Sequence, residues 1–175
     1  MPVELKILAS ARVSASDEFR TITAVAVRLL DHLNTASAQR EITKANRPGS
    51  SSSLVQSVFR EFALSLGFAD ESRGLFSEYE NRGLRPDYFM QVGDTGILLE
   101  VERGKTTINN MDLLDFWKCH LCAHANYLFL VVPKELRQNP TMAPRREFAA
   151  VAKRLATFFL PRNETNVRAL FLFGY

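Results

Sequence analysis

The stretch RPDYFMQVGDTGILLEVERGK, residues 85–105, decides the fold of this chain. Its two apolar segments, 87–92 and 97–103, are predicted strands. The Gly-Asp-Thr-Gly segment between them, residues 93–96, is typical of a hairpin because glycine adopts the positive backbone angles of a tight turn. The stretch therefore predicts two adjacent strands of a sheet.

Carboxylates gather on this predicted hairpin. Side chains alternate between the two faces of a strand, so Glu100 and Glu102 point to the same side. Pairing of the two strands would bring Asp87 across from the neighbourhood of Glu102. In a second interpretation, the two glutamates face solvent and form surface ion pairs with Arg85 and Arg103. The apolar run that precedes Glu100 favours an interior strand, where two acids on one face need a reason.

Three converging carboxylates raise one another's pKa unless a cation lies between them. Hard oxygen ligands favour Mg²⁺ or Mn²⁺. A divalent ion held by two carboxylates can bind a phosphate oxygen and activate water. The pattern therefore points to phosphodiester chemistry.

Working outward from the hairpin, the periodicity predicts alternating helices and strands. Helices are expected over 16–33, 54–66, 110–123 and 146–159, and further strands over 3–13, 75–80, 127–132 and 167–173. This order predicts an α/β fold, a mixed sheet flanked by helices. Residues 1–50 are expected to form a helical N-terminal extension with a short strand and a polar linker, and residues 51–175 the α/β domain.

Composition sets the class of protein. The 175 residues are 46% hydrophobic and 23% charged, as in an ordinary folded domain. No apolar run approaches the ~18 residues of a membrane span, so no membrane partner is expected. The two cysteines form no disulfide framework, and a cytoplasmic location is expected.

The hairpin resembles the PD-(D/E)xK nuclease superfamily, whose best-known members are type II restriction endonucleases. The resemblance lies in Pro86-Asp87, in the acid-x-acid strand, and in the surrounding order of helices and strands from about residue 54 to the C-terminus. It implies a restriction-endonuclease-like fold and a Mg²⁺-dependent (or Mn²⁺-dependent) endonuclease that hydrolyses DNA. It also implies that Asp87 and Glu100 hold the metal, with Glu61 as a further ligand from the preceding helix.

One position departs from the family pattern. The family has lysine where this chain has Glu102, which would then serve as a metal ligand or as the general base. Lys105 would take the role of the lysine, and Lys118 on the following helix is the weaker candidate. The departure also supports an alternative function, a catalytically impaired nuclease-fold module that binds DNA or a protein partner.

Charge is distributed unevenly along the chain. Residues 60–102 carry a net charge of −5 and residues 134–162 a net charge of +5, which suits a metal site beside a polyanion groove. The basic side chains expected on DNA phosphates are Arg145, Arg146, Lys153 and Arg154. Because cutting both strands needs two active sites, a homodimer is expected. A further alternative is an acidic face that docks a protein and has no role for DNA.

The segment Cys-His-Leu-Cys-Ala-His, residues 119–124, offers four zinc ligands. Consecutive ligands on one helix cannot surround a tetrahedral ion, so packing is the preferred interpretation. In that interpretation Leu114, Trp117 and Leu121 form the core stripe of this helix, and one or both cysteines are small buried hydrophobes.

Overall fold

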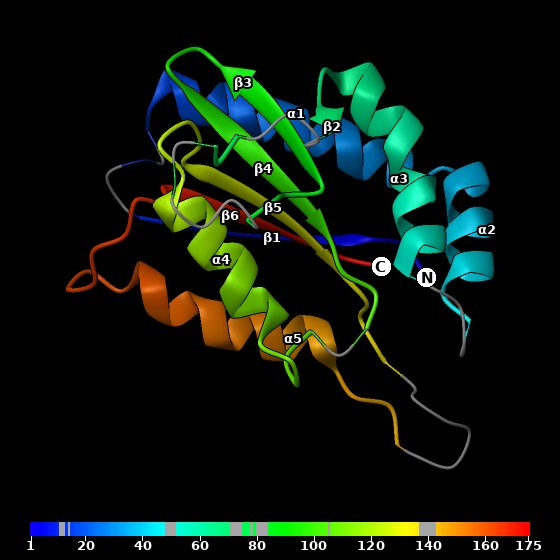
Figure 1. Cartoon of the computed structure of the whole chain (residues 1–175). Coiled ribbons are helices and arrows are strands. Elements are labelled where there is room, and N and C mark those ends of the chain that lie inside the picture. Colours follow the sequence, from blue (N-terminus) through cyan, green and yellow to red (C-terminus); the bar gives the residue numbers. More distant parts are fainter. Residues whose placement is uncertain are drawn as a thin grey trace.

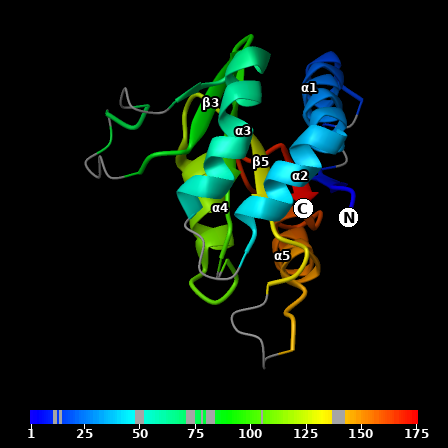
Figure 2. The same cartoon turned by 90° about the vertical axis from the view of Figure 1, so that its right-hand side faces the viewer.

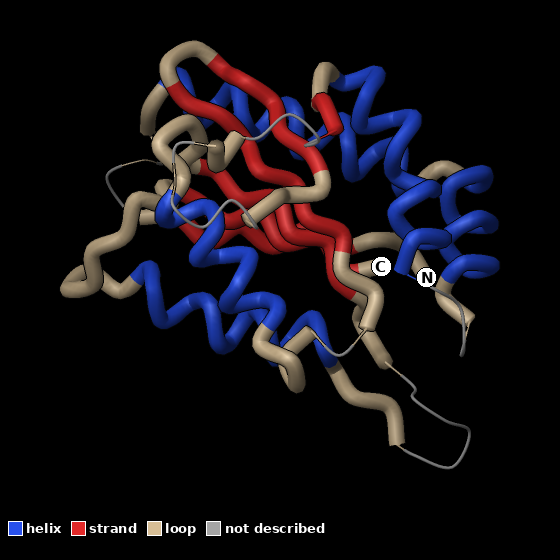
Figure 3. The backbone as a smooth tube through the Cα atoms, in the orientation of Figure 1, coloured by secondary structure: helices blue, strands red, loops and turns tan. Residues whose placement is uncertain are grey.

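A mixed sheet with strand order β1-β6-β5-β4-β3-β2 runs through the described part of the chain (Figures 1 and 3). The computed structural model describes residues 1–10, 13, 15–47, 52–70, 75–77, 79, 84–104, 106–136 and 143–175. The strands are β1 (Glu4–Ala9), β2 (Ala69–Asp70), β3 (Tyr88–Val92), β4 (Thr95–Val101), β5 (Tyr127–Val132) and β6 (Ala169–Gly174). The helices are α1 (Asp17–Leu33), α2 (Ala36–Ala45), α3 (Ser52–Leu66), α4 (Met111–Leu121) and α5 (Glu147–Leu155), followed by the 3₁₀ turn Ala156–Phe159.

The centre of the sheet is parallel and its edges are antiparallel. Strands β4, β5 and β6 run in the same direction, and α4 and α5 make the crossovers between them. The predicted hairpin is confirmed: β3 pairs with β4 antiparallel around Gly93, which has a φ of +57°. The predicted α/β class, a mixed sheet flanked by helices, is also confirmed.

Helices cover both faces of the sheet (Figure 1). One face packs against α1, α2 and α3 through side chains such as Leu99, Phe129 and Phe171. The other packs against α4 and α5 through the alternate positions of the same strands, such as Leu98, Leu130 and Leu172. The central strands are thus buried on both faces, which explains their nearly continuous apolar sequence.

The expected helical N-terminal extension is wrong. Strand β1 pairs antiparallel with β6 along its whole length, and α1 buries Ile22, Ala26, Leu29 and Leu33 in the core. The expected linker contains helix α2, whose first turn is capped by Thr35. Figures 1 and 2 show the two ends of the chain side by side. The reason is the β6 edge, which offers unpaired backbone groups that β1 satisfies.

The predicted strand over 75–80 is not found where it was expected. Residues 75–77 form a turn, and residues 78 and 80 lie outside the described residues. The short strand β2 pairs with β3 instead. This strand is two residues long, too short for a periodic pattern to reveal it.

The face of helix α4 that is buried is not the predicted one. Leu114, Trp117 and Leu121 are 41%, 51% and 43% exposed, so the predicted core stripe is wrong. The charged face of this helix, which carries Asp115 and Lys118, is buried instead. The buried cysteines agree with the prediction of packing. The orientation follows from a carboxylate on β4, described next.

Candidate functional site

The carboxylate of Asp87 lies at the entry to β3 and is tied to the end of β4. Its Oδ2 accepts a hydrogen bond of 2.8 Å from the Val101 backbone N–H. Its own backbone N–H donates to Glu100 Oε2 at 3.2 Å. The register continues from Tyr88 opposite Leu99, so Asp87 lies opposite Glu100 rather than opposite Glu102. The hairpin therefore joins the first two predicted metal ligands directly.

An ammonium group reaches this pair from α4. Lys118 Nζ donates to Glu100 Oε1 at 2.8 Å and to Asp115 Oδ1 at 2.9 Å. All three side chains are buried. Asp115 was not predicted to be in the site, although its spacing of three residues from both Asp112 and Lys118 places the three on one helix face. That spacing is the signal that would have identified it.

Burial and mutual repulsion perturb the acids of this group. Burial raises the pKa of Glu100 well above its usual value, and the Asp115 carboxylate adds to the rise. Burial also raises the pKa of Asp115 to about 6, although Lys118 opposes the shift. Burial by itself would lower the pKa of Lys118, but Glu100 and Asp115 raise it above its usual value. The lysine is therefore held as a cation between two carboxyl groups.

Glu102 follows β4 at the open end of the site. Its backbone N–H donates to the Val131 carbonyl at 2.8 Å, which extends the strand pairing by one residue. Burial, reinforced by the Asp115 and Asp87 carboxylates, raises the pKa of the partly buried Glu102 side chain to about 7. A carboxyl group with this pKa accepts and releases protons at neutral pH.

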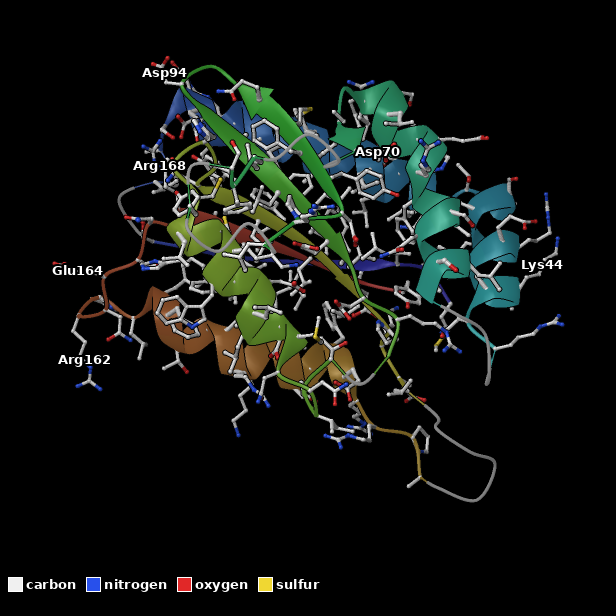
Figure 4. The ribbon with its side chains drawn as sticks, in the orientation of Figure 1. Lys44, Asp70, Asp94, Arg162, Glu164 and Arg168 are labelled. Atoms are coloured by element: carbon white, nitrogen blue, oxygen red, sulfur yellow. The ribbon has the colours of Figure 1, made fainter. Side chains whose placement is uncertain are left out.

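A second side of the site comes from α3. Gln56 Nε2 donates a hydrogen bond to Asp87 Oδ1 at 2.9 Å, and the Gln56 backbone carbonyl accepts a hydrogen bond from the Tyr88 hydroxyl. A cavity of about 270 Å³ opens beside Asp87; it is lined by Ser53, Gln56, Ser57, Arg60, Asp70, Asp87 and Tyr88. Arg60 forms an ion pair of 2.6 Å with Asp70, and Figure 4 shows Asp70 beside α3. A cationic group thus lies within the same cavity as a candidate metal ligand.

One predicted metal ligand does not join this group. Glu61 lies on a different face of α3, exposed, where it lines a separate cavity with His32 and Phe62. Gln56 takes the place on α3 that Glu61 was expected to fill. Lys105 lies outside the described residues.

The predicted DNA-binding residues have different surroundings. Arg154 is used internally: it donates to Asp112 at 3.1 Å and to the Thr107 carbonyl at 3.1 Å, which holds the loop after β4 against α5. Arg145 lies 3.5 Å from the buried Glu147 carboxylate. Arg146 and Lys153 are exposed at the two ends of α5. Arg145 is also exposed, so three of the four predicted residues lie at the surface and Arg154 is partly buried.

The acidic side chains of the site do not form a complete set of metal ligands. Within the described ranges, no three His, Cys, Asp or Glu side chains form a cage for a metal ion. Mg²⁺ does not need a cage, because it binds proteins through one or two carboxylates and keeps several waters. Asp87 and Glu100 are two neighbouring acids joined by a hydrogen bond, and among the described residues the buried Asp115 Oδ2 has no hydrogen-bond partner. Asp87 and Glu100 are the residues that could hold Mg²⁺ or Mn²⁺, since carboxylate oxygens are the ligands that these ions prefer.

No family model and no curated protein sequence matches this chain. Among the helices that the structure describes, none combines the length and hydrophobicity needed to cross a bilayer.

Proposed function

We propose that the protein is a Mg²⁺-dependent (or Mn²⁺-dependent) endonuclease of the PD-(D/E)xK type, which hydrolyses DNA phosphodiester bonds. One observation carries the proposal: Asp87 and Glu100 are joined at the end of a hairpin, with a lysine ammonium on the second carboxylate. The succession α3, β2, β3, β4, α4, β5 supports the restriction-endonuclease-like fold that the motif implies. The organisation matches the chemistry because charge that develops on phosphate needs cations nearby.

In this proposal Asp87 and Glu100 would hold the metal. Bound there, Mg²⁺ would supply charge neutralisation at the scissile phosphate and a water of lowered pKa. Gln56 and the Val101 N–H fix the orientation of Asp87 through both of its oxygens. A carboxylate locked from two sides loses little conformational freedom when it acts, which favours a preorganised site.

Lys118 is the proposed counterpart of the lysine that the motif lacks. Its ammonium lies 2.8 Å from Glu100, so it would orient the attacking water and stabilise negative charge beside the metal ligands. Glu102 is the proposed general base, since a pKa of about 7 allows it to take a proton from water at neutral pH. In this proposal the general base, Glu102, follows β4, whereas the lysine, Lys118, lies on α4.

DNA would approach over the cavity beside Asp87. In this proposal Arg60 in that cavity and the exposed Arg146 and Lys153 would contact phosphates, which contributes affinity without reading sequence. A second candidate function is the impaired nuclease-fold module that binds DNA or a protein. It is favoured by the oxygens of Asp87 and Glu100, all four of which already accept hydrogen bonds within the protein.

The test is metal-dependent cleavage of plasmid and single-stranded DNA by the full chain and by Asp87→Asn and Glu100→Gln. Both changes remove charge and keep side-chain volume. Cleavage with Mg²⁺ or Mn²⁺ should fall at least 100-fold in each variant, because each removes a metal ligand. Asp94→Asn is the matched control, since Asp94 is an exposed acid at the hairpin turn (Figure 4).

Two results would contradict the nuclease proposal. Cleavage that survives both substitutions would place the activity elsewhere or in a contaminant. Absence of cleavage with either metal, together with DNA binding that weakens steeply as salt rises, would favour the binding module. Circular dichroism of each variant separates loss of the site from loss of the fold.

A further inference from the structure

Helix α4 presents an apolar stripe to solvent. Leu114, Trp117 and Leu121 follow one another at intervals of three and four residues, so they lie along one face, and Ile108 precedes them in the loop. These four residues, here called the α4 stripe, are 41–51% exposed. Together they expose roughly 350 Å² of mostly apolar surface, which is within the size range of the largest apolar patch on a typical monomer, a patch that is often functional.

The stripe differs from ordinary exposed hydrophobic residues by its grouping and by its lack of charge. The charged residues of α4 are Asp112, Asp115 and Lys118, and all three are buried on the inner face. The Trp117 ring also packs edge-on against His120, with centroids 5.3 Å apart, so an aromatic anchor is already ordered. A hydrophobic centre poor in charge, with Trp and Leu, is the composition of a protein interface core. It offers no cation to a nucleic acid.

We propose that the α4 stripe binds the α4 stripe of a second copy of this chain, with the two helices antiparallel about a twofold axis. A twofold interface requires a surface that is complementary to itself. Leu114 and Leu121 meet this condition, since they are the same residue type at equal distances from the point between residues 117 and 118; Ile108 lies outside this symmetric part of the stripe. Leu114 would contact Leu121 of the partner subunit, and the reverse contact follows by symmetry, with Trp117 beside the axis.

The area of the stripe fits the centre of such an interface. A stable dimer buries about 800 Å² on each partner, and roughly 350 Å² of stripe would supply its apolar core. The rim would come from polar neighbours such as Asn109 and His120. Antiparallel helices also bring opposite ends of their dipoles together. Neither copy carries a charged side chain on the outer face of α4 that would repel the other.

This dimer does not depend on the nuclease proposal, and its test reads a different property. The mass of the full chain is measured by light scattering between about 1 and 200 μM, together with the emission of Trp117, the only tryptophan of the chain. The wild type should have twice the monomer mass of 19.8 kDa at high concentration. Its emission should shift to the red on dilution as the indole becomes solvated.

Charge substitutions test the stripe and its register. Trp117→Glu and Leu114→Glu should each raise the dimer dissociation constant at least tenfold. Leu114→Glu combined with Leu121→Lys should restore dimerisation, because an antiparallel twofold pair brings the introduced acid against the introduced base. Leu54→Glu is the matched control, since Leu54 is 52% exposed but lies on α3, away from the stripe.

Three results would overturn the proposal. The first is a wild type that stays monomeric at 200 μM. The second is a dimer that survives Trp117→Glu and Leu114→Glu in variants whose circular dichroism matches the wild type. The third is a charge-swapped double variant that dimerises no better than Leu114→Glu alone, which would reject the antiparallel register.

Discussion

The two faces of the sheet are built on different physical terms, although the same strands supply both. Towards α1, α2 and α3 the strands present an apolar surface, as at Leu99 on β4. Towards α4 the next residue of the same strand is Glu100, which meets Lys118 and Asp115. Among the described residues, the buried charged side chains belong to β4, α4 and α5, and α1, α2 and α3 contribute none.

The two layers differ in how they are stabilised. An apolar layer is stabilised by removing surface from water and by close packing. A buried ion pair contributes little net stability, since desolvation offsets the attraction between the charges. The α4 layer retains such groups, which is the arrangement expected where perturbed carboxylates do chemistry. The predictions below test whether the two layers respond differently to substitution and to pH.

The largest effect is expected at Lys118. Lys118→Met keeps the length of the side chain and leaves Glu100 and Asp115 buried without a cation. The free energy of unfolding should fall by about 3–5 kcal/mol at pH 8. The loss should shrink towards pH 5, because the two carboxyl groups then take up protons and become neutral. Urea unfolding followed by circular dichroism measures both values.

The double variant Lys118→Met/Glu100→Gln is the control for that prediction. It removes one of the stranded charges and should recover part of the lost stability at pH 8. A destabilisation by Lys118→Met that is equal at both pH values would show that packing rather than charge is responsible. That result would contradict the proposed difference between the apolar layer and the charged α4 layer in their response to pH.

A somewhat smaller loss is expected in the apolar layer. Leu29 on α1 is fully buried, and Leu29→Ala removes apolar contacts and leaves a cavity. The free energy of unfolding should fall by about 2–4 kcal/mol. The loss should be the same at pH 5 and pH 8, because Leu29 does not titrate. A loss that changes by more than 1 kcal/mol between these pH values would contradict this account.

The smallest expected effect is a gain in stability when Glu102 is replaced by glutamine. The pKa of its carboxyl group rises from 4.5 to about 7 on folding, so stability from this group is present below pH 4.5 and is lost as the pH rises to 7. Glu102→Gln cannot ionise. It should match the wild type near pH 4.5 and exceed it by about 1–3 kcal/mol at pH 8.

The exposed Glu61→Gln is the matched control for that gain and should change stability by less than 0.5 kcal/mol at either pH. Under the proposed function, Glu102→Gln should also abolish cleavage while it stabilises the fold. A variant that gains stability and keeps full activity would assign the general base to another residue.

The elements of strong local pattern were predictable from the sequence. The hairpin around Gly93 and the crossover through α4 follow from turn chemistry and from apolar runs that repeat with a clear period. Strand alternation and the tight turn predicted that the acids of the hairpin converge, although the register sets Asp87 opposite Glu100 and not opposite Glu102. Those inferences use contacts between residues that lie close in the chain.

Three features required the tertiary structure. Pairing of β1 with β6 joins the two ends of the chain. No local sequence pattern predicts pairing with a strand that begins 165 residues later. The orientation of α4 also escaped prediction, because the stripe of Leu114, Trp117 and Leu121 looks like a buried face until Glu100 is placed beneath the helix. Gln56 was missed because only packing of α3 against β3 brings its amide to Asp87.

The sequence by itself determined the α/β class, the hairpin and the pair of carboxylates it carries, since these depend on the chemistry of neighbouring residues. Only the tertiary structure decided which face of α4 is buried and that Lys118 contacts Glu100. The physical reason is the cost of an unpaired charge: buried Glu100 needs a cation, and Lys118 supplies it. Meeting that need turns the charged face of α4 inward and leaves Trp117 in solvent.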